Sequence, residues 1–296
     1  MWTTRAREAA MSADIPIWHL GGDGATTLNL AVANGFPPAT YAPLVAHLSA
    51  RFRVVTLPPR PLWPTNEQPP QDRRDWRHTI ARDLIDGIRA HDLRDLVAVG
   101  HSFGAVATIV AVNAMPERFK AVILLDPTIL PQAALWFIRA VRWTGRDLGN
   151  RLAQGADRRR DHFEGREAAY ERLRQKALFR DWHEDAFRGY IDSLQPDPSR
   201  GGLTLAWPRR WEAHYFRTIY TGIWRELPRL PHDIPTMMIR GGTSDTLLPS
   251  AARRIQRIMP RLIYHEIAGH GHLFPQSAPD ETARLILDWS ALAESR

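Results

Sequence analysis

The feature that most constrains this chain is a serine placed between two glycines, Gly100-His101-Ser102-Phe103-Gly104. An unbroken apolar run over residues 96–99 precedes it, as expected of a strand buried on both faces of a sheet. A run over residues 103–112 that is apolar all round follows it, as expected of a buried helix. A strand-to-helix turn this tight leaves little room for side chains two positions before and after the serine, so glycine fits both places. The pattern therefore predicts Ser102 in a strained turn at the end of a buried strand.

Strand and helix patterns alternate along most of the remaining sequence. Strands are expected at residues 15–20, 27–33, 52–57, 119–125, 235–240 and 262–267, and helices at 41–51, 77–93, 250–259 and 280–292. The glycine-rich link Gly21-Gly22-Asp23-Gly24 predicts a hairpin between the first two strands. The alternation that follows is typical of a parallel sheet with helices on its faces.

The composition changes over residues 131–231. This region has no strand-like runs and is rich in arginine, and six of the eleven tryptophans lie in it. Helices are expected at residues 166–182 and 208–220. We therefore predict a core domain made of residues 1–130 and 232–296, with residues 131–231 inserted as a mostly helical cap.

Charge and cysteine content narrow the classes of function. The formal charge is +7 with a pI near 10.3, but the arginines are interspersed with acidic residues, so we expect a solvated surface and no nucleic-acid partner. There is no cysteine, which excludes disulfides, thiolate nucleophiles and cysteine metal sites. No run approaches the ~18 apolar residues of a membrane span, and residues 1–14 lack the apolar region of a secretory signal. We expect a cytoplasmic protein without a membrane span.

The serine turn, with its strand before and helix after, resembles the nucleophile elbow of the α/β-hydrolase family. The resemblance covers residues 28–126 and 234–292. It implies an α/β-hydrolase fold, in which a mostly parallel central sheet is flanked by helices and carries a helical cap insertion. It also implies a catalytic serine, acid and histidine in that order along the chain, with no cofactor and no metal.

Two candidates exist for the catalytic base and two for the acid. Spacing alone does not choose between His270 and His272, but the family's glycine, histidine, apolar stretch and proline match Gly271-His272-Leu273-Phe274-Pro275 and favour His272. The loop ending in Asp245 resembles the family's acid loop and favours that residue. Asp126, at the end of an earlier strand, is the alternative, because some members of the family carry the acid there.

An oxyanion formed at Ser102 needs two N–H donors. The resemblance assigns these to the backbone of Phe103 and of Phe36. The family's usual His-Gly is replaced here by Asn34-Gly35, so we expect Asn34 to supply a side-chain hydrogen bond where histidine would. The expected substrate pocket is apolar and includes Asn34, Trp63, His101 and Phe274.

Together these features favour a serine hydrolase, specifically a carboxylesterase that cleaves a small apolar ester through an acyl-enzyme on Ser102. Other reactions on the same residues stay open: hydrolysis of a C–C bond, a lactone or an amide, and perhydrolysis. A ligand-binding protein without catalysis is the alternative from a different class. The sequence does not choose an oligomeric state.

Overall fold

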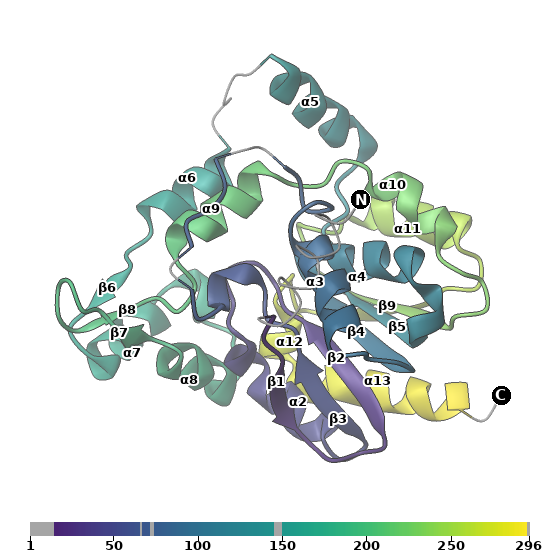
Figure 1. Ribbon diagram of the computed structural model, residues 1–296, viewed down its shortest axis with the longest axis horizontal. Helices are drawn as coiled ribbons and strands as arrows, with labels where there is room; N and C mark the ends of the chain where they lie inside the picture. Colours follow the sequence, from purple (N-terminus) through teal and green to yellow (C-terminus); the bar gives the residue numbers. More distant parts are fainter. Residues whose placement is uncertain (1–14, 66, 72–73, 145–149, 295–296) are drawn as a thin grey trace, which may run out of the picture.

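The computed structural model describes residues 15–65, 67–71, 74–144 and 150–294 (Figure 1). The expectation for residues 1–14 lies outside this range. No helix within it is both long enough and apolar enough to cross a membrane.

A seven-stranded sheet forms the centre of the molecule, in the order β1-β3-β2-β4-β5-β9-β10. Its strands are β1 (Trp18–Gly21), β2 (Thr26–Ala31), β3 (Phe52–Thr56), β4 (Leu96–His101), β5 (Phe119–Leu125), β9 (Thr236–Gly241) and β10 (Ile263–Ile267). Only β1 is antiparallel to its neighbour. The central strands β4, β5 and β9 are buried almost throughout, which explains their unbroken apolar runs. Because the other six strands of this sheet run in parallel, the loops after them meet at one edge of the sheet, where ligands bind in such folds.

The expected hairpin between the first two strands is wrong. β1 pairs with β3 instead of β2, with Trp18 opposite Thr56. The glycine link passes over the end of β3, since a Cβ on Gly22 would lie 2.2 Å from the Phe52 carbonyl oxygen. A glycine-rich link is equally compatible with both pairings, so the local pattern did not choose the partner strand.

Helices cover both faces of the sheet. They are α2 (Ala42–Leu48), α3 (Ile80–Ala90), α4 (Phe103–Ala114), α11 (Pro249–Ile258), α12 (Phe274–Ser277) and α13 (Pro279–Glu294). Helix α2 packs against α13, and α3 packs against α4; Figure 1 shows the two pairs on opposite faces. Helix α4, apolar all round, is buried along nearly its whole length, as its sequence predicted.

Between β5 and β9 the chain forms what we call the cap segment (residues 132–229). It contains α5 (Gln132–Trp143), α6 (Arg151–Arg158), α7 (Arg166–Arg174), α8 (Glu184–Asp192), α9 (Arg209–Arg217) and α10 (Ile223–Glu226). Although the sequence of this region shows no strand-like runs, β6 (His162–Phe163), β7 (Gln195–Pro196) and β8 (Leu203–Thr204) form a small antiparallel sheet there. Each strand has only two residues, too few for an alternating pattern to be visible in the sequence.

The six tryptophans of this region divide by position. Trp182, Trp207 and Trp211 are buried and belong to the main apolar core, and Trp224 packs against it. Trp136 and Trp143 on α5 are exposed, at 59% and 91%. Figure 1 shows α5 at the top of the molecule, above α6 and α9. The buried tryptophans therefore join the cap segment to the core, whereas those of α5 face solvent.

Candidate active site

Ser102 lies in the expected strained turn between β4 and α4. Its φ and ψ are 59° and −118°, a backbone conformation that residues other than glycine rarely adopt. The surrounding packing enforces it: a Cβ on Gly100 would lie 2.6 Å from Ala105 Cα, and one on Gly104 would lie 2.3 Å from the Ala31 carbonyl oxygen. The serine hydroxyl is directed to the carboxyl edge of the sheet and lines a cavity.

His272 lies in the loop between β10 and α12 and faces Ser102. Its Nε2 is 2.8 Å from Ser102 Oγ, and its Nδ1 is 2.6 Å from Asp126 Oδ2. A carboxylate only accepts hydrogen bonds, so Nδ1 carries the proton and Nε2 is left to accept the proton of Ser102. His270 is bonded elsewhere, through its Nδ1 to Ser277 Oγ at 2.8 Å.

The acidic partner of His272 is Asp126, not Asp245, so the preference for Asp245 is wrong for this contact. Asp126 follows β5 and is completely buried. Asp245 is exposed, and its carboxylate accepts a long 3.4 Å bond from Thr246 Oγ1. Both candidates follow neighbouring strands of the sheet, β5 and β9, which is why sequence order alone left both open.

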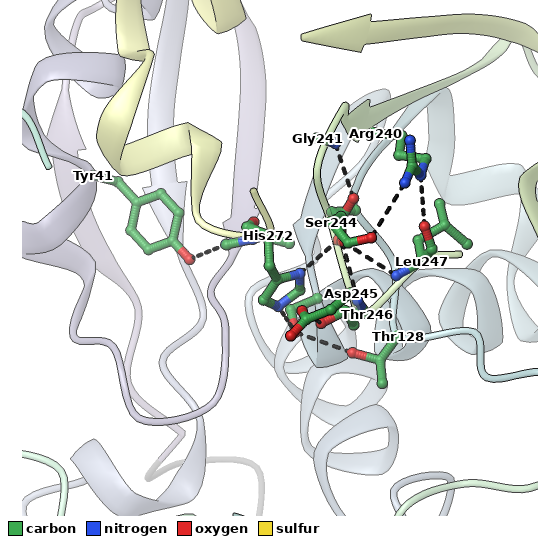
Figure 2. Close-up of polar contacts among 12 residues, drawn as sticks. Tyr41, Thr128, Arg240, Gly241, Ser244, Asp245, Thr246, Leu247 and His272 are labelled. Atoms are coloured by element: carbon green, nitrogen blue, oxygen red, sulfur yellow. Dashed lines mark hydrogen bonds and ion pairs between the residues drawn. The ribbon is translucent and has the colours of Figure 1, made fainter. Parts of the chain in front are cut away.

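The loop after β9 supports Asp126 instead of supplying the acid. The Gly241 N–H donates to Asp126 Oδ1 at 3.0 Å, and the Ser244 hydroxyl donates to Oδ2 at 2.5 Å. Ser244 Oγ itself accepts the N–H groups of Thr246 and Leu247 (Figure 2), which directs its own proton to Asp126. The buried carboxylate therefore has three donors, His272 included, as a buried charge requires.

Arg240 holds this loop in shape. The residue is only 2% exposed, and its guanidinium donates to the carbonyls of Leu247 and Ser244 (Figure 2). It also donates to the Gly242 carbonyl. It also lies 3.4 Å from Glu266. The donors to Asp126 are thus fixed by a second layer of hydrogen bonds.

A buried chain of hydrogen bonds supports His272 from behind. His101 Nε2 is 3.0 Å from the His272 carbonyl, and because a carbonyl only accepts, this nitrogen carries the proton. His101 Nδ1 therefore accepts from the Tyr41 hydroxyl at 2.7 Å, and that hydroxyl accepts the Ala33 N–H at 2.9 Å. Burial, together with the neighbouring His272, lowers the pKa of His101 well below its usual value. His101 is thus a neutral support and not a pocket residue, which corrects our expectation.

The two expected oxyanion donors differ in whether their N–H groups already have a hydrogen-bond partner. Phe103 is the first residue of α4, where N–H groups have no partner within the helix and the dipole favours negative charge. The Phe36 N–H instead donates to the Ala33 carbonyl at 3.2 Å, a long bond that an incoming oxyanion can share. A third polar group adjoins the site, since Thr128 Oγ1 is 3.0 Å from Ser102 Oγ.

Asn34 connects the Phe36 turn to the cap segment. Its Nδ2 donates to the Glu212 carbonyl on α9 at 3.1 Å, so the expected side-chain bond is made to the cap. Gly35, with φ 86°, leaves space for the Glu212 side chain, whose Cδ would be 3.0 Å from a Cβ there. Glu212 in turn pairs with Arg159 at 2.7 Å. The position of this turn therefore depends on α9.

A cavity of about 1240 Å³ opens beside Ser102 and His272. Of the expected pocket residues, Asn34 lines it together with Phe36 and Phe103. Trp63 and Phe274 do not line it: the Trp63 indole donates to the Pro58 carbonyl at 2.7 Å, and Phe274 is fully buried in the core. The apolar residues of its lining come from both the sheet edge and the cap segment.

Thr128, Ser244 and Arg240 were missed by sequence reasoning. Each acts through a hydrogen bond whose partner is distant in the chain or belongs to a loop of irregular shape, and no periodicity marks such residues. The position of Thr128, two residues after Asp126 at the end of β5, was the one available signal.

Comparison with known proteins agrees with the fold. The model of the Alpha/beta hydrolase family matches residues 30–285, most of the chain. The chain belongs to the alpha/beta hydrolase family.

Solved structures share the fold at low sequence identity. An E-2-(acetamidomethylene)succinate hydrolase superposes with a TM-score of 0.70 at 21% identity, covering 92% of this chain and 93% of that one. A thermophilic esterase from Thermogutta terrifontis gives 0.64 at 18%, covering 94% and 93%. An enol-lactonase from Burkholderia xenovorans gives 0.63 at 16%, covering 93% and 95%. The likeness extends over nearly the whole chain, cap segment included.

Proposed function

We propose that this protein is a serine hydrolase of the carboxylesterase type, with Ser102 as nucleophile, His272 as base and Asp126 as the acid that orients it. One observation carries the proposal: an unbroken chain of hydrogen bonds, 2.8 Å and 2.6 Å long, joins Ser102 Oγ through His272 to a buried Asp126. A serine hydroxyl is a weak nucleophile unless such a base and orienting group activate it.

The reaction proceeds in two halves. Ser102 Oγ attacks the ester carbonyl while its proton passes to His272 Nε2, and Asp126 stabilises the imidazolium that forms. The Phe103 and Phe36 N–H groups hold the oxyanion. Collapse of this intermediate breaks the bond to the alcohol, which takes the proton from His272. Water then attacks the acyl-enzyme with His272 as base, which releases the acid and restores Ser102.

The cavity supports an apolar ester as substrate. Phe36, Phe103 and Leu130 are among the apolar residues that line it. Apolar substrate surface that these residues bury from water favours binding by about 25 cal/mol per Å². Among the fold neighbours, one is an esterase and another an enol-lactonase. The alternative reactions, which are lactone, amide and C–C bond hydrolysis and perhydrolysis, would use the same three residues.

A fluorophosphonate probe tests whether Ser102 is activated. We expect stoichiometric labelling of the native protein, detected by mass spectrometry as an adduct on Ser102, and no labelling of Ser102→Ala. Ser199→Ala, which removes a hydroxyl of the cap segment bonded to Asp197, is the matched control and should label fully. A folded native protein that does not label would contradict the proposal and favour a binding protein without catalysis.

A further inference from the structure

The positive charge of the molecule is concentrated on the wall of the cavity. Among described residues this wall contains seven arginines and one lysine, against the two carboxylates of Glu212 and Asp245. The excess is six positive charges, whereas the formal charge of the entire chain is +7. The rest of the protein is therefore close to neutral, and the arginine-rich composition does not reflect a uniformly basic surface.

Most of these cations lack an internal counterion. Arg159 is paired with Glu212, and Arg217 with Asp157. Five others have no carboxylate partner among the residues that the structure describes; they are Arg151, Arg158, Arg160, Arg172 and Lys176. All five are exposed, and they lie on or directly after α6 and α7. Elsewhere on the surface, arginines of this chain commonly pair with nearby acids, as Arg82 does with Asp86.

Large apolar side chains lie among these cations at the same wall. Phe137 and Leu152 are each 64% exposed, and Leu178 is 46% exposed, yet all three line the cavity. The wall thus offers both apolar contact and positive charge. Like charges held together without counterions repel one another, and a bound anion relieves that repulsion.

We propose that the substrate is an amphiphilic anion: an ester with an apolar body at Ser102 and a carboxylate or phosphate group at a distance from the scissile bond. The remote anion pairs with the unpartnered cations of α6 and α7, while the apolar body fills the cavity. The identity of the ester bond rests on the proposed function, but the preference for an anion rests on the cavity wall alone.

The test measures binding to Ser102→Ala, which cannot turn the ligand over. One ligand pair has the charge at the acyl end: the mono-4-nitrophenyl ester of octanedioic acid and the same ester with its carboxylate capped as an N-methylamide. The other pair has the charge on the alcohol side: the hexanoate ester of 3-(4-hydroxyphenyl)propanoate and its N-methylamide. For at least one pair, we expect calorimetry to show about tenfold tighter binding of the anion, with a smaller ratio at high salt. The pair that shows it identifies the charged end.

Two variants place the effect. Each variant adds two substitutions to Ser102→Ala: Arg151→Gln with Arg158→Gln on α6, or Arg172→Gln with Lys176→Gln on and after α7. At least one of these two variants should show a smaller affinity ratio between the anion and its capped form. Both should leave the Kd of the capped ligand within twofold. Arg253→Gln with Arg257→Gln removes the same charge from α11, whose arginines do not line the cavity, and should leave the preference unchanged.

Equal affinity for anion and capped ligand in both pairs, or no binding of any of the four, would overturn the inference. Hydrolysis by the native enzyme is measured separately. Turnover without any anion preference refutes the inference and leaves the hydrolase proposal intact. A clear anion preference without turnover supports the inference and contradicts the hydrolase proposal.

Discussion

At the scale of single residues, His101 links stability to pH. Its pKa is lowered in the folded protein, first by burial and then by the neighbouring His272. The unfolded chain therefore binds a proton below about pH 6.5 that the folded protein does not bind, so stability falls as the pH falls through that range. The loss reaches at most about 1.4 kcal/mol per pH unit.

Urea unfolding at pH 7.5, 6.0 and 5.0 measures this effect. The free energy of unfolding of the native protein should fall more steeply with acidification than that of His101→Gln, which has no imidazole to protonate. His232→Gln, a substitution of an exposed histidine, should keep the native slope. Parallel curves for the native protein and His101→Gln would show that His101 does not carry this linkage.

Ser244 is a second residue whose effect can be isolated. Ser244→Ala removes one of three donors to the buried Asp126 carboxylate. A hydrogen bond to a charged group contributes about 1.5 kcal/mol or more, so ester hydrolysis should show a kcat lowered about tenfold with KM little changed. Ser277→Ala removes the partner of His270 and should leave kcat within about twofold. Equal losses in the two variants would remove the special role given to Ser244.

At the scale of elements, local sequence patterns predicted most strands of the central sheet. The expected strand at residues 119–125 matches β5, and those at 52–57, 235–240 and 262–267 match β3, β9 and β10 within one residue at each end. Three of them, β3, β5 and β9, are short and largely buried runs. The partner of β1 and the three two-residue strands of the cap segment could not be predicted, because pairing depends on residues distant in the sequence.

The elbow between β4 and α4 gives an element-scale prediction. Gly104→Ala places a methyl group 2.3 Å from the Ala31 carbonyl oxygen, so β2 and α4 must separate, at a cost of about 2–3 kcal/mol. Gly155→Ala in α6 is the matched control, because a Cβ there meets nothing within 4 Å. It should be neutral or raise stability by about 0.5–1 kcal/mol. Chemical denaturation midpoints compare the two, and equal stabilities would mean that the elbow is not closely packed.

At the scale of the whole molecule, the site is assembled from three parts of the chain that only the folded sheet brings together. Ser102 could be predicted from its neighbours in the sequence, and His272 from its loop. The acid could not, since Asp126 and Asp245 follow strands that are adjacent in the sheet. The choice between them depends on side-chain direction: one carboxylate is buried against His272 and the other faces outward along the cavity.

The most direct test of this assembly compares kcat/KM for 4-nitrophenyl butyrate in two matched variants, Asp126→Asn and Asp245→Asn. Asparagine preserves the shape of each side chain and removes its charge. Loss of the group that orients the histidine costs roughly 10⁴-fold in triads of this kind, so Asp126→Asn should be nearly inactive. Asp245→Asn should stay within about twofold of the native enzyme. A fall of that size in Asp245→Asn, with Asp126→Asn still active, would contradict the assignment of the catalytic acid.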